Sequence, residues 1–243
     1  MRATQVEFRF RFVVIAACFV VGFWCYRWDD LNVSVMLAQW LLGHPMDPGV
    51  ARDRHVWQAF LALGAVFAFL AALVRTWAAA YLQSDVVHDT KLHDEGLVAD
   101  GPYRYVRNPL YLGTTLLAVG FAMAASRLGF VVIVGGLSLF LQRLIGREEW
   151  LLSQTQGESY RQFLKAVPRL IPSLRPRVAA GGLRPHWGQA VAGEAFMWFF
   201  AVAAAYFAAT LSQRLFAAMA IAGVAASVVA KSVLWRKKPA AAQ

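Results

Sequence analysis

Apolar residues form long blocks along this chain, instead of recurring at the spacing of a surface helix or strand. Each block holds about 14 to 19 residues, close to the roughly 20 that a helix needs to cross a bilayer. Flanking Arg and Trp side chains, or a locally thinner bilayer, can accommodate the shorter ones. The pattern therefore predicts an all-α, polytopic membrane bundle of about six transmembrane helices. The blocks are Phe12–Tyr26, Val56–Val74, Leu110–Ala125, Leu128–Leu141, Ala195–Leu211 and Leu215–Ala230.

The blocks suggest three regions. Residues 1–74 hold two spans and a loop whose stretch Leu31–Leu42 is expected to lie in the membrane interface. Residues 75–177 hold a polar loop, a closely connected helix pair and a basic segment, and residues 178–243 add two spans. An alternative for the helix pair is one re-entrant hairpin, because the turn at Ser126-Arg127 is very tight. Two full spans are favoured over this alternative.

Charge supports a membrane location with a defined orientation. The chain is 59% hydrophobic and carries a formal net charge of +10. If the N-terminus is cytoplasmic, 19 of the 24 Lys and Arg residues fall in cytoplasmic segments. This distribution agrees with the excess of Lys and Arg that cytoplasmic loops of membrane proteins carry. Both termini are therefore predicted to be cytoplasmic, in the inner membrane if the host is bacterial. The cations are interspersed with spans, which argues against nucleic acid as a partner.

Two polar clusters at the ends of apolar blocks carry the candidate chemistry. The first is Gly101-Pro-Tyr-Arg-Tyr-Val-Arg-Asn-Pro-Leu-Tyr-Leu-Gly113, and the second is the pair Glu148-Glu149. A helix is expected to start at Pro109, with Arg107 and Asn108 before its positive end. Because the two intervening helices are antiparallel neighbours, Arg107 and Glu148 should meet on the same side of the membrane. The result would be a pocket with cations for a carboxylate and carboxylates for an ammonium group or hydroxyls.

Simpler interpretations of these residues stay open. Arg104 and Arg107 can be ordinary cytoplasmic anchors, and the tyrosines can belong to an interfacial belt. Glu148 and Glu149 can pair with Arg143 and Arg147 on a solvated helix. No metal is expected, because the histidines and acids between Asp85 and Glu95 match no compact ligand set.

The two clusters, followed by Gly157, Tyr160 and Val167-Pro168, resemble the isoprenylcysteine carboxyl methyltransferase family and its phospholipid methyltransferase relatives. That family carries an Arg-His-Pro-x-Tyr-x-Gly stretch, an apolar helix pair and a Glu-Glu pair. The resemblance covers roughly residues 75–175, and residues 75–177 would form the methyltransferase core. In this chain Asn108 replaces the family histidine, so any acid–base role at that position is in doubt.

The resemblance implies a cytosolic S-adenosylmethionine pocket. It assigns the following cofactor-binding residues: Leu97, Val98, Tyr103, Arg107, Asn108, Tyr111, Gly113, Glu148 and Glu149. Arg107 would orient a carboxylate and Glu148 would hold the ammonium or ribose, and these two are the candidate catalytic residues. Their alanine variants are expected to bind cofactor at least about tenfold more weakly, a loss of roughly 1.4 kcal/mol.

The resemblance also implies a membrane-dissolved lipid or isoprenoid acceptor, with O-methylation of a carboxylate favoured. One alternative is a phospholipid N-methyltransferase. Another is an NADPH-dependent membrane sterol or steroid reductase, which shares this helical core. A transporter is disfavoured, because the interiors of the apolar blocks hold almost no ionisable residues.

Overall fold

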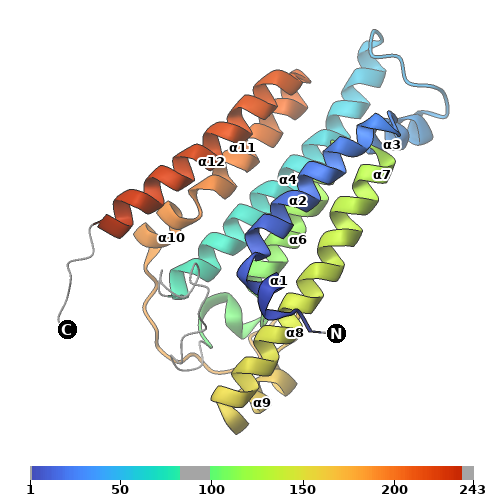
Figure 1. Ribbon diagram of the computed structural model, residues 1–243. Helices are drawn as coiled ribbons and strands as arrows, with labels where there is room; N and C mark the ends of the chain where they lie inside the picture. Colours follow the sequence, from blue (N-terminus) through green and yellow to red (C-terminus); the bar gives the residue numbers. More distant parts are fainter. Residues whose placement is uncertain (1, 83–98, 237–243) are drawn as a thin grey trace.

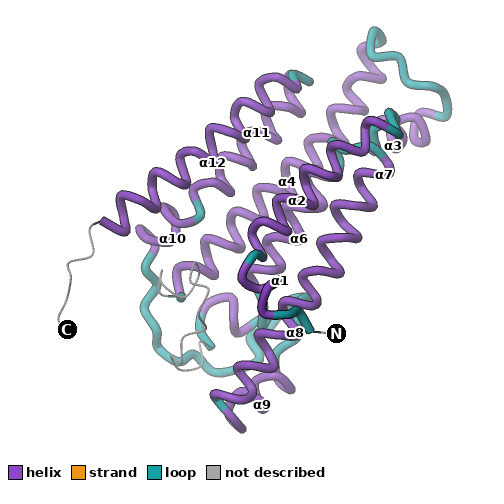
Figure 2. Tube along the Cα trace, in the orientation of Figure 1, coloured by secondary structure: helices purple, strands orange, loops and turns teal. Residues whose placement is uncertain are grey.

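The computed structural model describes residues 2–82 and 99–236, and it shows a bundle of long helices (Figure 1). The described residues form helices and loops without strands, apart from an isolated bridge between Asn32 and Ser126 (Figure 2). The predicted all-α class is therefore confirmed. The helices are α1 (Gln5–Arg9), α2 (Arg11–Trp24), η1 (Cys25–Arg27), α3 (Val33–Leu42), α4 (Ala51–Tyr81), η2 (Gly101–Arg104), α6 (Pro109–Ala122), α7 (Arg127–Phe130), η3 (Val131–Gly136), α8 (Leu137–Thr155), α9 (Gly157–Ala166), α10 (Trp187–Gly193), α11 (Ala195–Thr210) and α12 (Gln213–Arg236).

Helix α4 is the central element of the bundle, and it packs against α3, α6, α10 and α11. Buried alanines along α4 face Leu117 and Phe121 of α6 and Met197 of α11. A glycine pair brings α4 and α6 even closer, since a Cβ atom at Gly64 would lie 2.6 Å from the Gly120 carbonyl oxygen. Small side chains thus let backbones approach closely, which is how helices gain packing contacts in lipid.

The chain reverses direction between consecutive long helices, and its turns collect at two ends of the bundle. One end of the bundle holds the start of α1 together with η2, α9 and α10. The other end holds α3 and the α11–α12 turn (Figure 1). The α6–α7 turn at the second end is held by an ion pair of 2.9 Å between Arg127 and Asp29. Because α6 runs away from the first end and α8 runs back to it, Arg107 and Glu148 lie at the same end of the bundle.

Helix length limits how many segments can span a membrane. Among the described residues, two helices are long and apolar enough, Ala51–Tyr81 and the continuous stretch Arg127–Thr155. The pair α10 and α11 gives a third if its 58° bend falls within one broken span. The predicted count of about six spans is not confirmed, because α6, with 14 residues, and the searched part of α12, Gln213–Ala225, are shorter than a perpendicular span needs.

Candidate active site

Helix α6 begins where the sequence places its start. Pro109 is its first residue, and the backbone N–H group of Arg107, two residues earlier, donates to the Pro168 carbonyl oxygen at 2.9 Å. Proline suits this position because its fixed φ angle is helical and the N–H group it lacks would have no helical partner. The segment after α9 is thereby joined to the start of α6.

Tyr111 and Glu148 connect α6 to α8 directly. The Tyr111 hydroxyl donates to Oε1 of Glu148 at 2.6 Å. A short O–H···O contact to a carboxylate is among the stronger hydrogen bonds in proteins. Tyr111 also packs against a buried cluster that includes Phe8 of α1 and Phe140 and Leu144 of α8. The predicted juxtaposition of the two sequence clusters is thus present in the structure.

Glu149 is held between two arginines. Its Oε1 atom accepts from Nε of Arg107 at 3.1 Å, and its Oε2 atom lies 3.1 Å from Nε of Arg169. The Asn108 amide donates to the Arg169 carbonyl oxygen at 3.0 Å and makes a longer contact of 3.4 Å with Glu149. Asn108 therefore acts as a neutral hydrogen-bond donor that ties α6 to the segment after α9.

The remaining donors of Arg107 hold the end of α9. Its NH1 group donates to the carbonyl oxygens of Leu164 and Val167, the latter at 2.8 Å. A cation at the last turn of a helix satisfies its open carbonyls and complements the helix dipole. The described contacts of Arg107 are thus with the protein itself, and its contact with a ligand carboxylate stays a prediction.

The alternative pairing of the two glutamates with neighbouring arginines on α8 is not what the structure shows. Arg143 instead pairs with Glu7 of α1 at 2.8 Å, and Arg147 donates to the Ala3 carbonyl oxygen at 3.1 Å. The N-terminal segment therefore takes up these two arginines. Glu148 and Glu149 face the start of α6 instead.

A buried ion pair beside the site was missed by the sequence interpretation. Arg75 of α4 donates to both carboxylate oxygens of Glu194, at 2.7 and 2.9 Å, and Glu194 is fully buried. Arg75 also donates to the Leu110 carbonyl oxygen at 3.2 Å and to the Thr114 hydroxyl at 3.0 Å. One guanidinium thus joins α4, the first turns of α6 and the start of α11. The available signal was that opposite charges flank two apolar blocks at the same end of the bundle.

The other predicted site residues are Gly113, Tyr103, Leu97 and Val98. Gly113 faces α4, where an added Cβ atom would lie 2.4 Å from Cγ of Arg75. Tyr103 of η2 is buried, and this burial, with the negative charge of Glu148, holds its pKa well above the usual range. Leu97 and Val98 lie outside the described residues.

A crevice of about 360 Å³ opens beside these contacts. Three of its lining residues, Arg107, Lys165 and Arg177, are cations, and none of the described residues that line it is acidic. Its volume is near the lower end for small-molecule sites. The crevice is therefore suited to a small ligand that carries negative charge.

Comparison with known proteins supports the resemblance drawn from the two clusters. Residues 59–159 match the phospholipid methyltransferase family. This central segment is phospholipid methyltransferase-like. The matched segment contains most of α4 and all of α6 and α8, and with them Tyr111, Arg107, Glu148 and Glu149. The predicted family is confirmed over this part of the chain.

A relative with a named function is also found. Over 93 residues the chain is 38% identical to protein-S-isoprenylcysteine O-methyltransferase of Schizosaccharomyces pombe (strain 972 / ATCC 24843). The match covers 37% of this chain and 38% of that protein. No solved structure matches the chain significantly. The segment 59–159 thus matches a known family, whereas α1–α3 and α10–α12 lie outside it.

Proposed function

We propose that this protein is an integral membrane methyltransferase that uses S-adenosylmethionine to methylate a lipidic or isoprenoid acceptor. The supporting observation is the junction of α6 and α8, where Tyr111 contacts Glu148 and Arg107 contacts Glu149 within the methyltransferase-like segment. The similarity to an isoprenylcysteine O-methyltransferase favours a carboxylate as the acceptor group. About six short spans, a cytosolic site and cytoplasmic termini complete the proposal.

The residues present fit the proposed cofactor by their chemistry. Its methionine part carries a carboxylate and an ammonium group, and its ribose carries hydroxyls. The crevice beside Arg107 offers cations for the carboxylate, and Glu148 offers an acceptor for the ammonium group or a hydroxyl. Tyr103 and the predicted Leu97 and Val98 would line the pocket, and Asn108, Tyr111, Gly113 and Glu149 would support it.

The bound cofactor would supply a methyl group already activated by a sulfonium centre. A carboxylate acceptor needs no general base, so the contribution of the protein is alignment and exclusion of water. Tyr111 would fix the Glu148 carboxylate, and Glu149 would hold Arg107 at the end of α9. Arg75 would fix the first turns of α6, which carry Tyr111, through the Leu110 carbonyl oxygen and Thr114.

The decisive experiment incubates the purified protein with methyl-labelled S-adenosylmethionine and a total lipid extract, and then identifies labelled products by mass spectrometry. A methyl ester should release labelled methanol in mild alkali, whereas an N-methylated phospholipid should keep its label. Binding of NADPH without any labelled product would instead support the reductase alternative.

Glu148→Ala provides the matched test of the site. It should weaken cofactor binding at least about tenfold, as expected when one charge-assisted contact is lost. Gln154→Ala changes an exposed residue of the same helix and should leave binding unchanged. Calorimetric titration of both variants measures the affinity, and equal affinity of the Glu148 variant and wild type would remove Glu148 from the site.

A further inference from the structure

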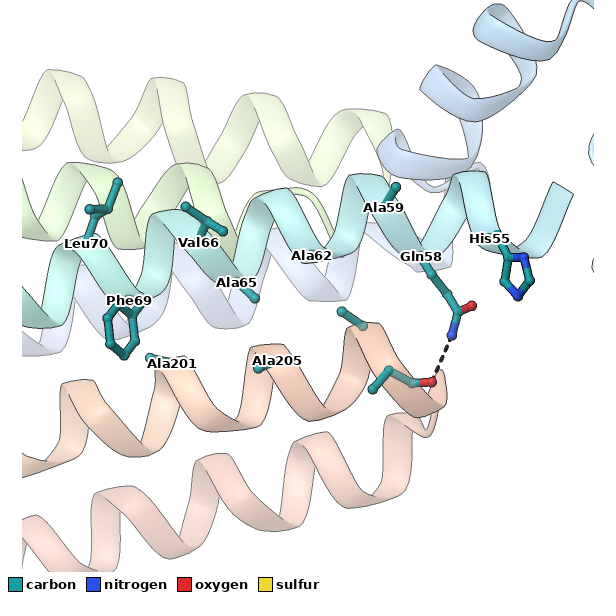
Figure 3. Close-up of a pocket in the computed structure, with 12 residues that line it drawn as sticks. His55, Gln58, Ala59, Ala62, Ala65, Val66, Phe69, Leu70, Ala201 and Ala205 are labelled. Carbon is teal, nitrogen blue, oxygen red and sulfur yellow. Dashed lines mark hydrogen bonds between the residues drawn. The ribbon is translucent and has the colours of Figure 1, made fainter. Parts of the chain in front are cut away.

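A long apolar groove runs between α4 and α11. Its volume is about 690 Å³, and ten of its twelve lining residues are apolar. The two polar ones, His55 and Gln58, stand near the start of α4, where Gln58 donates to the Ala209 carbonyl oxygen at 2.8 Å (Figure 3). The groove thus has an apolar body and one polar end.

Alanines explain why the groove is open. Seven of the lining residues are alanines from the facing sides of the two helices, and Ala65, Ala201 and Ala208 are buried beneath the groove. The larger Val66, Phe69 and Leu70 flank it along α4 and remain about half exposed (Figure 3). Small side chains between two helices leave a trench that an apolar chain can fill through van der Waals contact.

The length of the groove matches a lipid tail. From His55 to Leu70 the α4 axis rises about 22 Å, at 1.5 Å per residue. One leaflet of the hydrocarbon core is about 15 Å thick. The groove is therefore long enough to hold an acyl chain that crosses one whole leaflet. Its polar end falls where the lipid headgroup would lie.

The polar end carries two exposed arginines. Arg52, Arg54 and His55 are exposed in the first turn and a half of α4, whose backbone N–H groups add the positive end of a helix dipole. The nearby Asp53 is buried, 3.8 Å from Nδ1 of His44, and accepts from the backbone of Asp47. Within residues 2–82 and 99–236 no ion pair is formed by Arg52 or Arg54. A phosphate group complements this set of donors.

We infer that the α4–α11 groove binds an anionic phospholipid, with an acyl chain along the alanine-lined trench and the phosphate beside Arg52 and Arg54. This site is separate from the candidate active site, because it occupies the half of α4 that begins at His55, whereas Arg75 lies near the opposite end. One wall is α11, which lies outside the methyltransferase-like segment. The inference does not depend on the proposed reaction.

The test compares phosphatidylglycerol with phosphatidylcholine on the purified full chain. After delipidation in detergent, each lipid is added back, and the bound fraction is measured by native mass spectrometry. Wild type should retain phosphatidylglycerol preferentially. The double variant Arg52→Gln/Arg54→Gln should bind phosphatidylglycerol about 30-fold more weakly, the loss expected when two cations beside an anionic headgroup are removed. Arg161→Gln, an exposed cation on α9, should change nothing.

A second pair of variants tests the trench itself. Ala205→Phe places a ring in the groove at an exposed position, and it should abolish retention of both lipids. Ala222→Phe adds the same ring at an exposed position of α12 outside the groove and should retain them. Equal retention of the two lipids by wild type, or equal loss in both phenylalanine variants, would overturn the inference. A dimer that only Ala205→Phe dissociates would also overturn it, because the groove would then bind a second copy.

Discussion

The buried pair Arg75–Glu194 should be a principal source of stability at the end of the bundle that holds the site. Glu194→Leu removes the only carboxylate that Arg75 contacts in the described part of the chain, and it leaves a guanidinium with 11% of its side chain exposed. Breaking a buried ion pair by removing one partner costs about 3–5 kcal/mol, because the other charge stays buried without compensation. The bonds from Arg75 to Leu110 and Thr114 remain, so the lower half of that range is expected.

The double variant Arg75→Leu/Glu194→Leu separates this cause from simple loss of contact. With both charges gone, no buried charge is left, and replacement of an ion pair by apolar residues is often close to neutral. The Thr114 hydroxyl still donates to the Leu110 carbonyl oxygen at 3.1 Å. The double variant should therefore be more stable than the Glu194→Leu single variant by about 2 kcal/mol or more.

Equilibrium unfolding in mixed detergent micelles, followed by circular dichroism, gives the free energies of unfolding for this cycle. A coupling energy near zero, or a loss below about 1 kcal/mol in Glu194→Leu, would refute the reasoning, because such values are typical of solvated surface pairs. Trp198→Phe is a matched control on the same helix, since it removes a neutral hydrogen bond of 3.0 Å to Thr76 and should cost about 1 kcal/mol.

Two further predictions concern the contacts around the site. Gly113→Ala should lower the free energy of unfolding by about 1–3 kcal/mol, because the added methyl group would press on Arg75. The control Gly135→Ala should be neutral or slightly stabilising, because nothing lies within 4 Å of the added methyl group. Thermal melting of both variants measures the difference, and equal effects would contradict the steric argument. The Arg143 guanidinium, helped by a backbone hydrogen bond from Thr4, lowers the pKa of Glu7 to about 2, so the stabilising contribution of Glu7 is complete above pH 4.5 and is lost as the pH falls toward 2. The melting temperatures of wild type and Glu7→Gln should therefore differ at pH 6 and converge toward pH 2, and a difference independent of pH would refute this.

The helices were predictable because their signals are local. Blocks of apolar residues specify helices in a bilayer, and Pro109 begins a new helix where the sequence indicates. The six blocks coincide largely with helices between α2 and α12, whereas the number of spans that they form stays a prediction. Helix α4 runs without a break through residue 74, where the sequence places the boundary between the first two predicted regions. This boundary therefore stays a prediction.

The approach of the two polar clusters could also be predicted, because two antiparallel helices joined by a short turn leave few alternatives. The partners within the site could not. Arg107 holds the end of α9, and Glu149 takes Arg169 as a second partner, from a segment whose return to α6 depends on the α8–α9 turn. The choice among many nearby cations is made by helix rotation and loop path, neither of which is encoded by residue spacing.

The sequence by itself determined the helical class, the methyltransferase-like segment and the meeting of the clusters around Arg107 and Glu148 at one end of a helix pair. Only the tertiary structure decided that Arg75 pairs with Glu194, 119 positions later in the chain, and that alanines on α4 and α11 leave an open groove. The physical reason is that helix formation and burial in lipid depend on neighbouring residues. Ion pairs and grooves depend instead on which faces of distant helices meet.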